Sequence, residues 1–171
     1  MALVVAAALL PAGCGEEVRE FTPLEAYFDQ LGSIGRDLDG QSDALVDEIG
    51  DQFNVGDDAP LEEVVAAQRA FLDGSARILE DGIRAAAALA PPPEVSDAHR
   101  EFLRTATDFL GLFSILSERM ARVQSFEELE ALFEDPGPEF EEASGRFGQA
   151  CSRLEEIAVV NGIDADLDCG G

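Results

Sequence analysis

Residues 91–123 read PPPEVSDAHREFLRTATDFLGLFSILSERMARV and carry the clearest structural pattern in the chain. Apolar side chains recur there every seven positions, with others between them at helical spacing: Val95, Phe102, Ala106, Phe109, Phe113, Leu116, Met120 and Val123. This spacing puts them on one stripe of an α-helix. The pattern therefore predicts a long helix that buries this stripe against other helices.

A similar stripe lies nearer the N-terminus: Leu24, Phe28, Leu31, Leu38, Leu45 and Ile49. Thr22 and Glu25 form a capping box, and Pro23 takes the first helical position. We therefore expect a helix from there to about Phe53. Three glycines weaken the middle of this segment by about 1 kcal/mol each relative to alanine. The glycines allow a kink or a break near Asp39–Gly40, and the sequence leaves open whether this segment is one helix or two.

A second helix is expected from Pro60 to the three prolines at 91–93, which end it. Its apolar stripe is Leu61, Val65, Leu72, Ala76, Leu79, Ile83 and Ala86. Further along the chain, Ser125 and Glu128 form another capping box. This box predicts a short helix that ends at about Glu134.

The last helix is predicted from the break at residues 135–138 to Asn161–Gly162, a good C-terminal cap. Its stripe consists of Phe140, Phe147, Cys151, Leu154 and Ile157. No segment reads convincingly as a β-strand. Four long helices joined by short loops predict an all-α fold, an up-down four-helix bundle with one extra short helix between the third and fourth long helices.

The composition is that of an acidic, folded protein. The 171 residues suffice for one domain with a sizeable core, and 46% of them are apolar. Eleven arginines, with no lysine, oppose 36 acidic residues, so the net charge is −25. This charge argues against nucleic acid as a partner, because phosphate binding needs a basic patch. It favours cations and basic partners.

Residues 2–10, ALVVAAALL, are apolar but too few to span a bilayer, and they fit the hydrophobic core of a signal peptide. The segment that ends at Cys14 resembles a bacterial lipobox, with the small residues Ala12 and Gly13 before the cysteine. It departs from that pattern at Pro11, where leucine is usual, and it lacks a basic residue before the apolar run. The alternatives are an ordinary secretory signal and a short buried helix.

The lipobox resemblance implies that residues 1–13 are a lipoprotein signal peptide and that Cys14 carries a diacylglyceryl group. Residues 14–21 are then a tether, and residues 22–171 form the helical domain. Two or more acyl chains give stable anchoring. We therefore expect the protein to be held on the cell membrane through Cys14, facing the extracytoplasmic side.

Cys151 and Cys169 are the other two cysteines, and an oxidising compartment favours a bond between them. From Cys151 the predicted helix rises about 15 Å to Asn161. The seven residues 162–168 can return about 23 Å when extended. The tail can therefore reach Cys151, and a disulfide there contributes about 3 kcal/mol. The alternative is a buried free thiol at Cys151 and a loose thiol in the tail.

Asp164, Asp166 and Asp168 alternate in the way that the first ligands of a calcium loop do. The EF-hand pattern requires glycine at its sixth position and glutamate at its twelfth. Cys169 takes the sixth position here, and the printed sequence ends at Gly171. We interpret the segment as a solvated acidic turn, with a calcium site as the weaker alternative.

His99 is the only histidine and lies at the start of the stripe in residues 91–123. General-base and metal-ligand roles come to mind. However, no second histidine exists for a metal centre, and Ser96 replaces the glutamate of the di-iron Glu-x-x-His motif. Met120 lies about 31 Å away along a straight helix, too far to share a haem. We therefore expect His99 to be hydrogen-bonded near the end of the bundle.

Catalytic signatures are absent from the sequence. No Gly-rich phosphate loop, G-x-S-x-G, H-E-x-x-H or cysteine–histidine pattern appears. Glutamate pairs such as Glu62–Glu63 and Glu127–Glu128 are interpreted as solvated faces. We therefore expect neither enzymatic activity nor a cofactor.

Three features resemble uncharacterised helical lipoproteins of high-GC bacteria: FTPLEAYF at residues 21–28, the PPPEV turn before Ala98–His99, and the closure from Cys151 to Cys169 around Asn161–Gly162. The resemblance brings no activity with it. The expected function is that of a binding or structural envelope protein with a protein partner in the envelope. The alternatives are a bundle that binds a small apolar ligand or a cation, and a hydrolase with an unrecognised carboxylate site.

Overall fold

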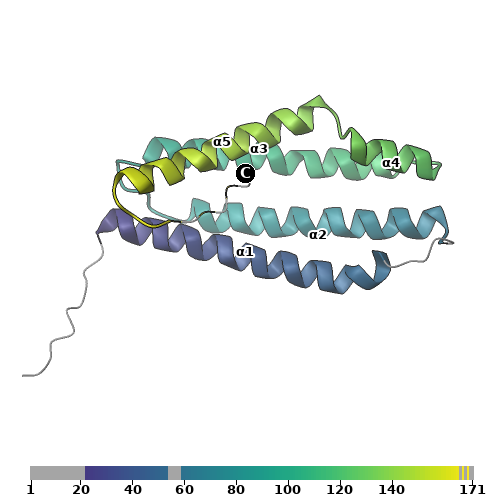
Figure 1. Cartoon of the computed structure of the whole chain (residues 1–171), viewed down its shortest axis with the longest axis horizontal. Coiled ribbons are helices and arrows are strands. Elements are labelled where there is room, and N and C mark those ends of the chain that lie inside the picture. The colour runs from purple at the N-terminus through teal and green to yellow at the C-terminus, as the bar shows by residue number, and fades with distance from the viewer. Residues whose placement is uncertain (1–21, 54–58, 166, 168, 170–171) are drawn as a thin grey trace, which may run out of the picture.

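The computed structural model describes residues 22–53, 59–165, 167 and 169 (Figure 1). This part of the chain is all-α and contains no strand, which confirms the predicted fold class. Each helix begins and ends within a few residues of its predicted bounds. The helices are α1 (Pro23–Phe53), α2 (Leu61–Ala87), α3 (Ser96–Met120), α4 (Phe126–Glu134) and α5 (Pro138–Val160).

Local capping explains several of these bounds. At the start of α1, Thr22 Oγ1 accepts from the backbone N–H of Glu25 at 3.2 Å, and the Glu25 carboxylate accepts from the N–H of Thr22 at 2.8 Å. Ser125 caps α4 by accepting from the N–H of Glu128 at 3.2 Å. After α5 the chain turns at Gly162, whose φ of 71° lies in the left-handed region. All three signals were predicted from the sequence.

The sequence left open whether the helix breaks near Asp39–Gly40, and the structure shows that it does not: α1 is one uninterrupted helix of 31 residues. Its packing against α2 explains why. Leu38 and Leu45, on either side of the weak point, both sit against glycines of α2. Tertiary contact on this face outweighs the low helix propensity of the glycines.

At two places in the contact between α1 and α2, a glycine of α2 leaves a notch that a leucine side chain of α1 fills. An added Cβ at Gly82 would lie 2.6 Å from the Leu38 side chain, and one at Gly74 would lie 2.6 Å from that of Leu45. The two leucines are seven residues apart and the two glycines eight, so both pairs recur on one face of each helix. The absence of side chains at these glycines lets the two helices approach closely.

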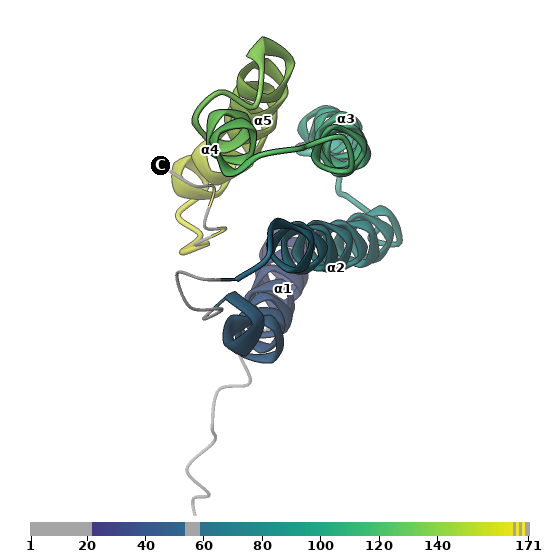
Figure 2. The same ribbon diagram turned by 90° about the vertical axis from the view of Figure 1, so that its right-hand side faces the viewer.

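The long helices pack in chain order: α1 on α2, α2 on α3, and α3 on α5 (Figure 2). The short helix α4 lies beside the last turns of α3 and continues the line of α5 (Figure 1). Leu129 and Leu132 are the buried residues of α4. Together α4 and α5 cover the length of α3.

Two core clusters lie toward opposite ends of the helices. The first cluster draws residues from all four long helices: Tyr27, Phe28, Leu31, Ala86, Val95, Ala98, Leu154 and Ala158. The second cluster draws only on α2, the end of α3 and α4: Leu72, Met120, Leu129 and Leu132. We call the part around the first cluster the sealed end and the part around the second cluster the pocket end.

Half-buried phenylalanines join α3 to α5 between the two clusters. Phe109 stacks on Phe147 with ring centroids 5.7 Å apart and planes 4° from parallel. Phe109 also contacts Phe113 and Phe140, both with centroids 5.5 Å away. Phe102 contacts Phe147 at 5.4 Å. Such aromatic pairs add specific geometry to the apolar area that they bury.

Candidate binding pocket at one end of the bundle

His99 lies in the first turn of α3 and is 5% exposed. Its Nδ1 is hydrogen-bonded to the hydroxyl of Tyr27 on α1 at 2.9 Å. The two rings meet edge to face with centroids 5.7 Å apart. The predicted hydrogen bond of His99 near a bundle end is therefore confirmed, and its partner links α3 to α1 at the sealed end.

Burial keeps both members of this pair neutral. It raises the pKa of Tyr27 to about 12 and lowers the pKa of His99. A buried polar pair that satisfies itself avoids the cost of an unpaired polar group. We interpret the Tyr27–His99 pair as a structural link between helices.

Cys151 and Cys169 are bonded, with Cα atoms 5.4 Å apart. The predicted approach of the tail to α5 is therefore present in the structure. Cys151 is buried on the apolar face of α5, and Cys169 lies in the tail. The bond closes a loop that contains the end of α5 and the turn at Gly162.

The tail between the turn and Cys169 covers the sealed end. Ile163, Ala165 and Leu167 pack against the first core cluster. The backbone N–H of Leu167 donates to the Glu155 carboxylate at 3.2 Å. We call these three apolar residues the strap. The disulfide therefore holds the strap against the core, and the tail is not only a solvated acidic turn.

Other predicted site residues are not brought together. Cys14, the lipidation site, lies outside the described residues, as do Asp166 and Asp168 of the weak calcium candidate. Asp164 is exposed after α5. Within the described part of the chain, no group of three or more histidine, cysteine, aspartate or glutamate side chains could hold a metal ion.

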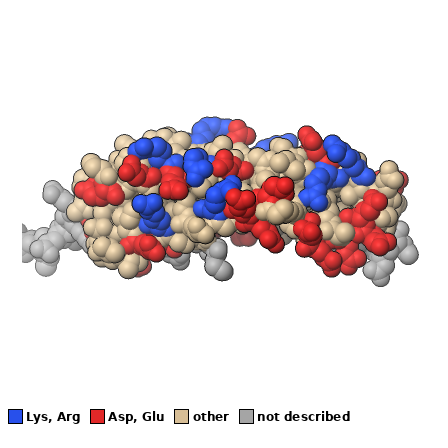
Figure 3. Space-filling model, turned by 90° about the horizontal axis from the view of Figure 1, so that it is seen from above, with Lys and Arg blue, Asp and Glu red and all other residues tan. Residues whose placement is uncertain are grey.

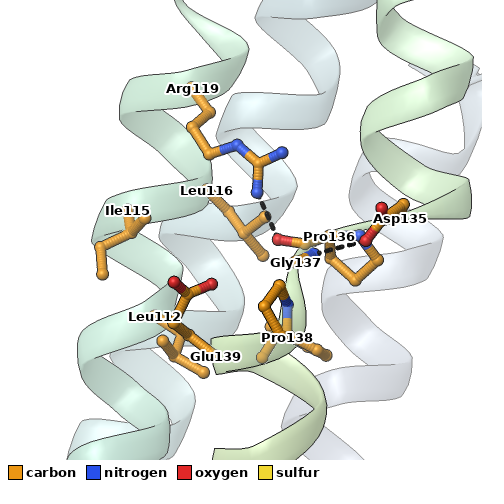
Figure 4. A pocket seen from close by; sticks show the side chains of 10 residues that line it. Leu112, Ile115, Leu116, Arg119, Asp135, Pro136, Gly137, Pro138 and Glu139 are labelled. Atoms are coloured by element: carbon orange, nitrogen blue, oxygen red, sulfur yellow. Dashed lines mark hydrogen bonds between the residues drawn. The ribbon is translucent and has the colours of Figure 1, made fainter.

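A surface pocket of about 530 Å³ opens at the pocket end, between α3 and the turn from α4 to α5 (Figure 4). This volume falls within the range of small-molecule sites. Two successive turns of α3 form one wall, and the turn with the start of α5 forms the other. The lining residues are Leu112, Ile115, Leu116, Arg119, Asp135, Pro136, Gly137, Pro138, Glu139 and Phe140.

The turn that shapes this pocket is held by hydrogen bonds. The Arg119 guanidinium donates to the backbone carbonyl of Pro136, which ties the turn to α3 (Figure 4). The N–H of Gly137 donates to the Asp135 carboxylate at 3.1 Å. Gly137 has a φ of 108°, which side-chain-bearing residues rarely adopt. Pro138 then starts α5 at the first helical positions, where its ring is favourable.

Opposite charges flank the glycine inside the pocket. A Cβ at Gly137 would lie 3.0 Å from the Glu139 carboxylate and 3.3 Å from the Arg119 guanidinium. The Asp135 carboxylate is already engaged by the N–H of Gly137. Figure 4 shows Glu139 reaching from α5 toward Leu112 of α3. The pocket thus combines apolar walls with one cationic group, Arg119, and two anionic groups, Asp135 and Glu139.

The pocket end is also strongly acidic on its outer surface. Figure 3 shows acidic side chains gathered over the half of this face that α4 occupies, with arginines among them. The nine residues of α4 include four glutamates and no basic residue. Toward α5 the charges are mixed, and Arg146 pairs there with Glu142. A ligand approaches the pocket through a negative field, which repels anions.

This pocket was not predicted from the sequence. Residues 135–138, DPGP, were interpreted only as a helix break. In the sequence, the available signal of an unusual turn was a glycine between two prolines, at residues 136–138. This local signal does not show that Arg119, which lies 17 residues before Pro136, holds the turn beside α3.

None of the described helices has the length and apolar composition that a membrane span requires. Comparison with known proteins gives no relative: no protein-family model matches the chain, and no curated protein or solved structure is significantly similar to it.

Proposed function

We propose that this protein is a lipid-anchored, extracytoplasmic binding protein that takes a small ligand in the pocket between α3 and the α4–α5 turn. The observation that carries the binding role is the pocket itself. Its apolar walls and its few charged groups, Arg119, Asp135 and Glu139, are the composition that small-molecule sites use for affinity and orientation.

The anchor and the location rest on the sequence. Cys14 follows an apolar run and two small residues, as in a lipobox, and the acyl groups on it would hold the domain at the membrane. The bond between Cys151 and Cys169 supports an oxidising compartment, because such bonds persist outside the cytosol. Residues 14–21 serve as the tether in this proposal.

We further propose that the helices form an up-down four-helix bundle, with α4 as an extra short helix before the last long one. Contacts between consecutive long helices support this topology. The short connection at the prolines 91–93 also supports it, because short loops join antiparallel neighbours. In this arrangement the pocket lies where α4 and α5 share the fourth position.

Native mass spectrometry of the chain isolated from its own membranes tests both parts of the proposal. We expect a chain that starts at Cys14, carries acyl groups, and gains two hydrogens on reduction. We also expect a bound small molecule, which Ile115→Ser at the pocket rim removes. Val46→Ser is the matched control, since Val46 on α1 is about as exposed as Ile115 and does not line the pocket.

Two results would contradict the proposal. An unacylated chain would remove the anchor. If the Ile115→Ser variant retains the small molecule as well as the Val46→Ser variant does, the binding site lies elsewhere.

A second role, docking to an envelope protein, is favoured by one observation. Phe126 and Phe133 lie seven residues apart on α4, and both are about half exposed: 53% and 51%. Exposed aromatic pairs of this kind are common at interfaces. The test is cross-linking in intact membranes: the double variant Phe126→Ser/Phe133→Ser should lose a cross-linked species that Val46→Ser keeps. Its retention in the double variant would exclude α4 as the docking surface.

A further inference from the structure

We infer that the pocket ligand is a zwitterion with an apolar body, and specifically a free apolar α-amino acid. This inference rests on the proposed binding function and names the class of ligand for the same site. The observation behind it is the pair of opposite charges, Arg119 and Glu139, on two sides of Gly137. Both side chains line the pocket, and they approach Gly137 this closely because it has no side chain of its own.

The two charges remain available to a ligand. Arg119 spends one N–H on the Pro136 carbonyl, and a guanidinium has five N–H donors. Glu139 is exposed at the start of α5. Arg119 is thus positioned to hold a carboxylate, and Glu139 an ammonium. An α-amino acid carries these two groups on adjacent atoms.

The rest of the pocket selects the side chain of the ligand. Leu112, Leu116 and Phe140 supply apolar and aromatic surface beside the charged floor. Burying a ligand side chain against them gains roughly 25 cal/mol per Å² of apolar area. The third charged group of the lining, Asp135, accepts one hydrogen bond from the N–H of Gly137 and adds a second negative charge beside the ammonium site.

The field of the protein argues against the simpler ligands. With a net charge of −25, the protein repels a ligand that carries only a carboxylate. A ligand that carries only an ammonium is attracted, but it leaves Arg119 unmatched in the pocket. A zwitterion has no net charge and satisfies both groups.

Calorimetric titration with three matched compounds tests the inference on the full-length chain carrying Cys14→Ser. L-phenylalanine has both charged groups, phenethylamine only the ammonium, and 3-phenylpropionate only the carboxylate, on the same apolar body. We expect L-phenylalanine to bind at least tenfold more tightly than either analogue.

Two variants test which protein charge binds which charged group of the ligand. Arg119→Gln should bind L-phenylalanine no better than phenethylamine, and Glu139→Gln no better than 3-phenylpropionate. The matched controls, Arg122→Gln and Glu141→Gln, change nearby exposed charges that do not line the pocket and should leave all three affinities unchanged. Thermal unfolding of every variant checks that the fold is intact.

The outcomes separate this inference from the proposed function. An analogue that binds as tightly as L-phenylalanine, and that Ile115→Ser loses, overturns the zwitterion and keeps the pocket as a binding site. Binding of none of the three compounds also overturns the inference, and the native mass measurement then decides the binding function independently. The inference would also be overturned if the control variants lost as much affinity for L-phenylalanine as Arg119→Gln and Glu139→Gln, because the loss would then reflect the overall charge.

Discussion

The two ends of this bundle are closed in different ways. At the sealed end, all four long helices contribute to one core cluster, a buried Tyr27–His99 pair joins α1 to α3, and a disulfide fastens an apolar strap. At the pocket end, α2, α3 and α4 make a smaller cluster, and a glycine turn stands beside α3 over a pocket of about 530 Å³. The comparison shows that the sealed end is the more tightly packed of the two, and in the proposed function the pocket end binds the ligand.

The largest effects should come from matched truncations of the two clusters. Leu154 is fully buried in the first cluster, and Leu132 is 6% exposed in the second. Leu154→Ala should lower the free energy of unfolding by about 4 kcal/mol, and Leu132→Ala by about 2 kcal/mol, because the cost grows with the cavity that cannot collapse. Urea unfolding measures both. Equal losses would show that the two ends contribute alike.

The disulfide should come next. Replacing both Cys151 and Cys169 by alanine should cost about 3 kcal/mol, since the bond closes a loop of 18 residues. We also expect faster hydrogen exchange at residues 161–167, with no change in α4. Urea unfolding and exchange mass spectrometry report the two effects. Faster hydrogen exchange in α4 as well would contradict the view that the disulfide stabilises only the sealed end.

The notches between α1 and α2 predict that alanine substitutions at two glycines change the free energy of unfolding in opposite directions. Gly82→Ala should lower the free energy of unfolding by about 1 kcal/mol, because its Cβ would meet Leu38 and the overpacking exceeds the gain in helix propensity. Gly40→Ala has open space around it and should raise that free energy by about 0.5 kcal/mol. Thermal unfolding of the two variants tests this. Stabilisation by both would mean that the notch does not set the spacing of α1 and α2.

The smallest effect should be a pH dependence of the sealed end. Because burial lowers the pKa of His99 in the folded state, the unfolded chain binds the proton more tightly. The stability from neutral His99 is present above the ordinary pKa of about 6.5, and it falls as the pH drops through that value toward the folded pKa. Between pH 7.5 and 5, the Tm of the wild type should therefore fall relative to that of His99→Gln. Parallel Tm curves would contradict the buried neutral pair.

Local signals in the sequence predicted most of the fold. Thr22 and Ser125 cap their helices, prolines end or begin them, and Gly162 turns the chain, all through neighbours within a few residues. The reach of the tail to Cys151 followed from chain length alone. Whether the first helix is continuous at Asp39–Gly40 stayed open in the sequence, because helix propensity does not include the packing of α1 on α2.

The site was not predictable in the same way. The partner of His99 is Tyr27, which is adjacent to the stripe residue Phe28 and was not assigned to the core. The pocket depends on Arg119 holding a turn 17 residues away, a contact that no local pattern encodes. Both features arise only when separate helices are placed side by side.

The most direct test of the central claim is an NMR titration of the ¹⁵N-labelled, full-length Cys14→Ser chain with L-phenylalanine. If the pocket end binds and the sealed end is structural, saturable shift changes should be confined to residues 112–119 and 135–140. Changes centred on Tyr27, His99 and the strap, or no saturable change at the pocket, would contradict that account.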